Sequence, residues 1–156
     1  MKKIAVLGVA LATLLAGCSN TPTMSYEEKN IAYADYIVSN KLESLKKINT
    51  FRLHGWQSLT NDYLILSTSP KKKFLIEVNG YCPDLGFAHA IKINQSMSSM
   101  LSTRFDSISV INGDMASHQI KCHIKTIHQI DKAQAKEISA IGKPVGEEQA
   151  TDERKS

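Results

Sequence analysis

Apolar side chains recur at helical spacing from residue 26 onward. Ser25 and Glu28 form the Ser-x-x-Glu pattern of a capping box, and Glu27 adds negative charge to the first turn, where the helix dipole favours it. Asn40-Lys41 is a common helix stop, which leaves one long helix or two short ones open. The stripe expected to pack on a sheet consists of Tyr26, Ile31, Ala34, Ile37, Val38, Leu42 and Leu45.

After Lys47 the pattern changes to short apolar runs separated by turn residues. Runs 63–67 and 74–78 are joined by a short turn, which is typical of an antiparallel hairpin. From Phe74 every other residue of the second run is apolar, which indicates a core face. The sequence predicts five or six strands, at 48–53, 63–67, 74–78, 90–93, 105–111 and 120–127, with turns at Asn61-Asp62, Ser69-Pro70-Lys71, Asn79-Gly80 and Asn112-Gly113-Asp114.

The end of the chain predicts one more helix and a tail. Asp131 is placed to cap a helix from Lys132 to about Ser139, which is built from good helix formers. Residues 141–156 contain few aliphatic side chains and are expected to be disordered. Residues 25–140 are expected to form one α+β domain: an N-terminal helix packed on a curled antiparallel sheet or small barrel of five or six strands, and a short C-terminal helix.

The first eighteen residues have the pattern of an export signal. Lys2 and Lys3 precede a 12-residue apolar run, which is shorter than the ~20 residues of a membrane span. Residues 1–17 are therefore expected to be removed as a signal peptide. The Leu-Ala-Gly-Cys sequence at 15–18 also resembles the lipobox of bacterial lipoproteins, which implies that Cys18 carries a diacylglycerol. The alternative is an ordinary secretory signal with an incidental cysteine.

The lipobox resemblance also implies a location. Two or more acyl chains hold a protein at a bilayer for practical purposes permanently. In enteric-type lipoproteins an Asp after the cysteine favours the inner membrane, and Ser19 stands there instead. The expected location is therefore the outer membrane, with the protein facing the periplasm. Residues 18–24, with Pro22 and no apolar period, are interpreted as a tether between lipid and domain.

Charge and motifs narrow the possible partners. The chain has 19 basic and 15 acidic residues, and loss of Lys2 and Lys3 leaves a net charge of +2. So small a charge gives no argument for nucleic acid. The sequence has no GxSxG elbow, phosphate-cradling glycine loop or CxxC, and no cofactor is expected. The lysines at 71–73 are interpreted as solvated, with contact to anionic lipid or an envelope protein as the alternative.

Three cysteines suggest one lipid site and one pair. If Cys18 is acylated, Cys82 and Cys122 remain in an oxidising compartment, and a disulfide between them is the simplest account. Ile120, Cys122 and Ile124 face one side of the last predicted strand, so Cys122 is expected to point into the core. The alternative left open is two free thiols, one of which is a nucleophile or a metal ligand.

Four motifs are spread over residues 42–130. They are Ile48-x-x-Phe51-x-x-x-Gly55-Trp56, Cys82-Pro83-Asp84-Leu85 followed by Phe87-Ala88, Arg104-Phe105-Asp106, and Cys122-x-Ile124-x-x-Ile127. Together they resemble a family of small exported proteobacterial proteins classed only as a domain of unknown function. The resemblance implies an exported α+β domain with Cys82 and Cys122 as its paired cysteines. It implies no activity, cofactor or partner.

The candidate ligand or partner contacts are Trp56, His54 and Arg104. Trp56 is expected to be a core lid, with stacking on a sugar or peptide as the alternative. Asp84 is expected to form a turn or to cap a helix over 85–90, and Arg104 to pair with Asp106; acid–base chemistry by these carboxylates is the alternative.

The five histidines offer no metal motif. They are His54, His89, His118, His123 and His128, and none stands in HxxxH or HExxH spacing, so no metal is expected.

The function expected from these features is non-enzymatic. The first hypothesis is a lipid-anchored envelope protein with a binding or structural role towards an envelope protein, peptidoglycan or a small apolar ligand. The second is an envelope hydrolase with Cys82 as nucleophile and His89 or His123 as base. The third is a metal or redox sensor that uses Cys122 with His118 or His123.

Overall fold

The computed structural model describes residues 23–50, 53–111 and 120–143. The expected leader and Cys18, the turn at 112–114 and the tail beyond 143 lie outside these ranges, as does His118. None of the helices in the described ranges is long and apolar enough to cross a membrane. The elements are α1 (Tyr26–Ser39), β1 (Lys47–Asn49), β2 (Gly55–Ser58), β3 (Tyr63–Ser67), β4 (Lys73–Val78), the 3-10 turn η1 (Leu85–Phe87), β5 (Ala90–Asn94), β6 (Met100–Ser102), β7 (Ser107–Ile111), β8 (Lys121–Ile130) and α2 (Lys132–Ala140).

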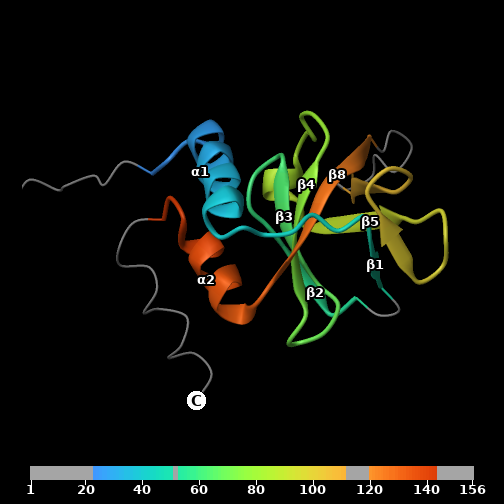
Figure 1. Ribbon diagram of the computed structural model, residues 1–156. Helices are drawn as coiled ribbons and strands as arrows, with labels where there is room; N and C mark the ends of the chain where they lie inside the picture. Colours follow the sequence, from blue (N-terminus) through green and yellow to red (C-terminus); the bar gives the residue numbers. More distant parts are fainter. Residues whose placement is uncertain (1–22, 51–52, 112–119, 144–156) are drawn as a thin grey trace, which may run out of the picture.

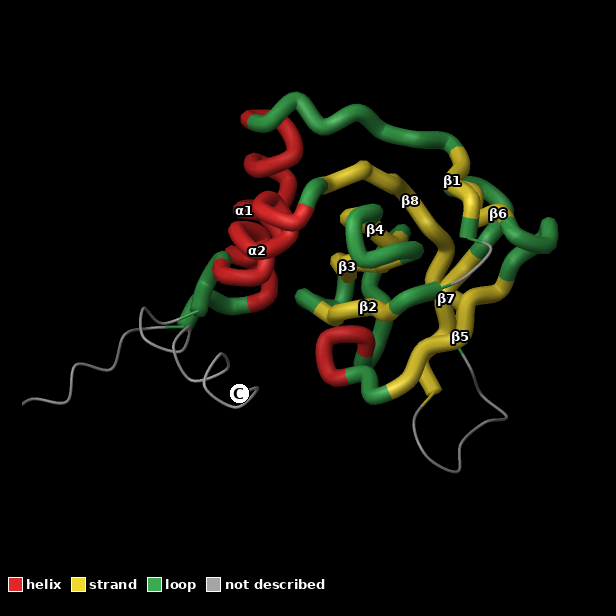
Figure 2. Tube along the Cα trace, turned by 90° about the horizontal axis from the view of Figure 1, so that it is seen from below, coloured by secondary structure: helices red, strands yellow, loops and turns green. Residues whose placement is uncertain are grey.

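The architecture is the predicted α+β arrangement. Six strands form an antiparallel sheet in the order β2-β3-β4-β8-β7-β5, and β1 pairs with β6 in a separate two-stranded sheet (Figure 1). The large sheet curls into a half-barrel, and both helices stand outside it (Figure 2). The prediction of an N-terminal helix, a curled antiparallel sheet and a short final helix is confirmed.

The central strands β3 and β4 are apolar on both faces. Leu64 and Leu66 of β3 belong to one cluster of buried side chains, the inner core, which also includes Ile108 of β7 and Ile127 of β8. Tyr63 and Ile65, which point the other way, belong to a second cluster, the helix-side core. Full burial of a side chain such as leucine contributes about 1.5–3 kcal/mol, so neither face is stable without cover. The inner core consists of Ile48, Leu64, Leu66, Phe74, Ile76, Val78, Cys82, Leu85, Leu101, Ile108, Cys122, Ile124 and Ile127, and the helix-side core of Tyr33, Tyr63, Ile65, Leu75, Ile130, Ala135 and Ile138.

Helix α1 begins where it was predicted to begin, but the face that it buries is not the predicted apolar stripe. The capping box between Ser25 and Glu28 is present, and the helix stops with Asn40 as its C-cap, so it is a single short helix. Ile31 and Val38 were expected in the buried stripe, but they are 59% and 75% exposed. That part of the prediction is wrong because the inward face instead carries Tyr33, which is 2% exposed.

Several strand boundaries also differ from the prediction. β2 and β6 are strands that the apolar pattern did not predict, and the strand expected at 48–53 ends at Asn49. Phe105 lies in a turn and is 75% exposed, so the strand expected from 105 starts at Ser107. Ile120 precedes β8 and is 58% exposed, whereas Cys122 and Ile124 point into the core as expected.

The turn between β2 and β3 connects α1 to the sheet. The Thr60 side chain is fully buried; its hydroxyl donates to Oδ1 of Asn30 at 2.6 Å and accepts from the backbone amides of Asp62 and Tyr63 at 3.2 and 3.1 Å. Nδ2 of Asn30 in turn donates to the Asp62 carboxylate. Polar groups on the inward face of α1 are thereby satisfied, which buried polar atoms require.

Replacing Thr60 with valine keeps the side-chain shape and removes all three hydrogen bonds. We expect Thr60→Val to lower the free energy of unfolding by about 2 kcal/mol, because buried amides lose their acceptor. Urea unfolding followed by circular dichroism measures this. The control is Thr103→Val, whose hydroxyl makes one long bond of 3.4 Å to the Lys46 carbonyl, and which should change stability by less than about 0.5 kcal/mol. Equal losses in both variants would contradict the assignment.

Candidate functional site

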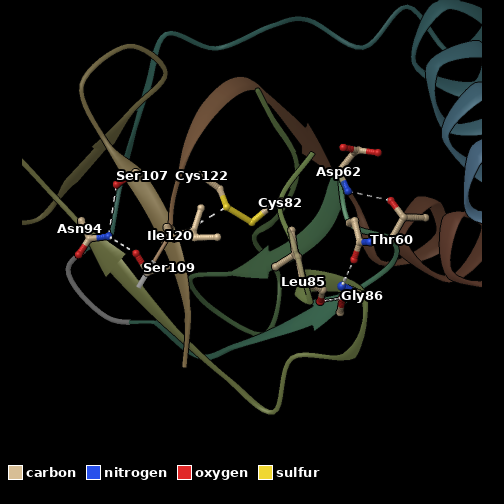
Figure 3. Close-up of a disulfide and its surroundings, with 12 residues drawn as sticks. Thr60, Asp62, Cys82, Leu85, Gly86, Asn94, Ser107, Ser109, Ile120 and Cys122 are labelled. Carbon is tan, nitrogen blue, oxygen red and sulfur yellow. Dashed lines mark hydrogen bonds between the residues drawn. A yellow bond between two sulfur atoms is a disulfide. The ribbon is translucent and has the colours of Figure 1, made fainter. Parts of the chain in front are cut away.

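Cys82 and Cys122 form a disulfide, with the sulfur atoms 1.93 Å apart and the Cα atoms 5.6 Å apart. Cys82 lies in the loop between β4 and η1, and Cys122 is the second residue of β8. Figure 3 shows the bond crossing between these segments, with Leu85 and Ile120 near it. The two residues are 1% and 4% exposed, so the bond belongs to the inner core. The predicted pairing is confirmed.

The loop that carries Cys82 is also held by the β2–β3 turn. The backbone amide of Cys82 donates to the Asn61 carbonyl at 3.3 Å, and the amide of Gly86 donates to the Asn61 side chain at 2.9 Å. Asp84 takes a left-handed backbone conformation, with φ of 62°, and makes no side-chain cap bond to η1. The prediction of a turn is right, but the helix expected over 85–90 is a three-residue 3-10 turn.

A bonded cysteine cannot act as a nucleophile, because attack requires a free thiolate. Cys82 therefore offers no nucleophile to the hydrolase hypothesis in this form, and Cys122 offers no thiolate ligand to the sensor hypothesis. His89 and His123 are exposed. Within the described ranges no three His, Cys, Asp or Glu side chains gather in a way that could hold a metal ion.

His128 is buried and has a structural role. Its Nδ1 lies 3.2 and 3.1 Å from the carbonyl oxygens of Leu42 and Glu43. Carbonyl oxygens only accept hydrogen bonds, so this nitrogen carries the proton. The ring thereby ties the segment after α1 to β8, where Ser44 also forms an isolated bridge with His128.

Trp56, His54 and Arg104 do not form one site. Trp56 lies in the edge strand β2 and packs half-buried against the inner core, as expected for a core lid. His54 precedes it and is exposed. Arg104 is exposed in the turn after β6, which belongs to the other sheet. The residue after Trp56, Gln57, points to the opposite face of β2.

Asp106 is a buried carboxylate that organises its own loops. It is 1% exposed and accepts from the amide and hydroxyl of Ser96 at 2.7 and 2.5 Å, and from those of Ser102 at 2.7 and 3.2 Å. The predicted pairing with Arg104 is therefore wrong; backbone and serine donors replace the guanidinium. Burial raises the pKa of Asp106, but the bonds from Ser96 and Ser102 outweigh it and hold the pKa below its ordinary value.

A basic groove lies between α2 and the edge of the large sheet. Its volume is about 680 Å³, and among the residues that the structure describes none that lines it is acidic. Lys132, Lys136 and Ser139 follow each other at spacings of four and three, which places them on one face of α2. Lys73 comes from β4. The lysine groove, as we call it, is lined by Gln57, Lys73, Lys132, Ala133, Ala135, Lys136, Ser139 and Lys143.

Some side chains of the lysine groove are held by hydrogen bonds, and others are exposed to solvent. The Ser139 hydroxyl donates to the Ala135 carbonyl at 2.7 Å and lies 3.2 Å from Oε1 of Gln57, which joins α2 to β2. Nζ of Lys73 donates to the Ser67 hydroxyl at 3.0 Å. Lys132 and Lys143 are exposed. Four lysine side chains around one hollow give it a positive charge that favours an anionic ligand.

Nearby acidic side chains have other partners. On α2, Glu137 accepts a hydrogen bond of 2.6 Å from the Tyr36 hydroxyl, and Asp131 accepts one of 2.8 Å from the amide of Gln134. A smaller hollow of about 450 Å³ mixes both signs of charge: it contains Lys41 and Lys71 together with Glu43 and Asp131. Of these two hollows, the lysine groove is the one whose described charged residues are all positive. From the sequence, helical spacing could have indicated only the groove residues on α2, because Lys73 and Gln57 come from distant strands.

One family model matches most of the chain. The model described as a family of unknown function (DUF6491) matches residues 1–141. The chain belongs to the DUF6491 family. No curated protein and no solved structure matches it. The DUF6491 match includes both bonded cysteines and all of the lysine groove except Lys143.

We expect the disulfide to stabilise this DUF6491 domain. The two cysteines are 40 residues apart, and the chain-entropy model assigns a loop of that length about 4 kcal/mol. We expect the double variant Cys82→Ala/Cys122→Ala to lose about that amount in urea unfolding. Cys18→Ser is the matched control, because it removes a cysteine and keeps the bond. Reaction with a thiol reagent in denaturant should detect no thiol from Cys82 or Cys122; two free thiols there would contradict the assignment.

Asp106 predicts an acid-dependent loss of stability. Because its folded pKa is lowered, its contribution is present above the pKa of the unfolded chain, about 4, and is lost as the pH falls through the folded value. Asp106→Asn should cost about 2–3 kcal/mol at pH 7, and less at pH 3. Urea unfolding at both pH values tests this, with the exposed Asp35→Asn as control. A cost that is the same at both pH values would exclude the charge as its cause.

Proposed function

We propose that this protein is a lipoprotein, anchored through Cys18 to the outer membrane and facing the periplasm, that serves as a non-enzymatic binding or structural module of the cell envelope. The observation that carries the proposal is the Cys82–Cys122 bond. With those two sulfurs joined, Cys18 is the one cysteine of three left for other chemistry. It stands at the end of a lipobox-like sequence, and disulfides of this kind are typical of oxidising compartments.

The lysine groove supports a binding role rather than a catalytic one. It gathers four lysines, and the described part of its lining contains neither an acidic residue nor a histidine, the usual general bases. The Trp56 and Asp106 side chains, which the sequence offered for stacking or acid–base work, are engaged in the core and in loop bonds. The partner of such a surface is an anionic component of the envelope, such as a lipid, peptidoglycan or an acidic protein.

The anchor is tested by the mass of the N-terminal peptide of protein made in a bacterial host. We expect a peptide that begins at Cys18 and carries the added mass of a diacylglycerol. Cys18→Ser should abolish that mass, because serine has no thiol to accept the lipid. Asn20→Ala, two residues further on, is the matched control and should keep it. A wild-type protein that is unacylated and still begins at Met1 would contradict the proposal.

A further inference from the structure

The start of the domain lies beside the end of the lysine groove. A side chain built on Gly142 would place its Cβ 2.9 Å from the Cβ of Met24 and 2.6 Å from Cε of Lys29, so both residues lie against this glycine. The next residue, Lys143, lines the groove. In Figure 1 the chain enters α1 and leaves α2 on the same side of the molecule, away from β5.

This placement fixes where the proposed anchor would emerge. Six residue steps separate Cys18 from Met24, and a fully extended chain spans about 3.3–3.6 Å per residue, or roughly 20 Å in all. A lipid on Cys18 therefore holds Met24, Gly142 and Lys143 close to the bilayer surface. Tethering of this kind raises the effective concentration of lipid headgroups at the groove without any new contact.

We propose that the lysine groove docks on anionic phospholipid headgroups of the same membrane that holds the lipid anchor. This inference rests on the proposed function, because it is the anchor that brings the groove to the bilayer. Anionic headgroups attract clustered lysines within about a Debye length. Phosphate groups in the groove are attracted by the lysines that line it. Docking would also fix the orientation of the domain, with α2 towards the bilayer and β5 away from it.

The test uses the mature lipoprotein added to preformed vesicles of phosphatidylcholine alone, or of phosphatidylcholine mixed with phosphatidylglycerol. A membrane-impermeant amine reagent labels exposed lysines, and peptide mass spectrometry reads each site. On the anionic vesicles we expect labelling of Lys132, Lys136 and Lys143 to fall about five-fold relative to neutral vesicles. Lys92 on β5 and Lys121 at the start of β8, the end of that strand remote from α2, serve as internal controls and should label equally. High salt should restore labelling at the groove.

A matched pair of variants isolates the charge. In Lys132→Gln/Lys136→Gln the protection of Lys143 should disappear, whereas in Lys92→Gln/Lys121→Gln it should remain. All four positions are exposed, so neither variant removes core packing.

The failures of the two proposals are distinguishable. Protein that does not stay on neutral vesicles lacks the anchor, which contradicts the proposed function. Protein that stays on both vesicles without protection of the groove, or with equal protection on both, keeps the anchor and overturns the docking. A third outcome also overturns the docking proposal. The groove lysines could be protected when soluble anionic glycan strands are added to protein on neutral vesicles, and not by phosphatidylglycerol. The ligand of the groove would then be an anionic polymer and not a lipid.

Discussion

The fold depends on two strands that cannot be left with either face in water. β3 is buried at all five of its positions, and Leu75 and Ile76 of β4 are fully buried on opposite faces. Such a hairpin needs a cover on each side. On one side the sheet provides it by curling, so that β7 and β8 close over the hairpin. On the other side α1 and α2 provide it. The hydrogen bonds of the β2–β3 turn and the disulfide hold these two covers in place.

The β2–β3 turn joins the two covers. Thr60 and Asp62 hold α1 through Asn30, while Asn61 holds the loop of Cys82 from the other direction. The disulfide then fastens that loop to β8. One short turn therefore couples the helix layer to the disulfide that closes the inner core. Thr60 belongs to neither apolar cluster, yet it holds a turn that is bonded both to α1 and to the Cys82 loop.

The sequence predicted elements where the local pattern carried all the information. β3 was predicted to the residue because a compact apolar run stands between clear turn residues. The capping box of α1 and the Asp131 cap of α2 likewise mark where those helices start. The buried face of α1 was missed because it includes Asn30, whose partners Thr60 and Asp62 are thirty residues away. β2 was missed because Gly55, Gln57 and Ser58 carry no apolar signal. The cysteine pair followed from an even count. The lysine groove joins Lys73 of β4 to residues of α2 that are distant in the chain, so it has no local signature.

The order of strands in the sheet has a consequence for biosynthesis. β4 has β8 as its neighbour, and the 42 residues 79–120 lie between them in the chain. The helix-side core also requires Ile130, Ala135 and Ile138, which come from the last part of the domain. A growing chain can therefore complete neither core until nearly all of it has been synthesised. Until then the apolar side chains of β3 and β4 lack their covers, which leaves them open to contact with other unfolded chains.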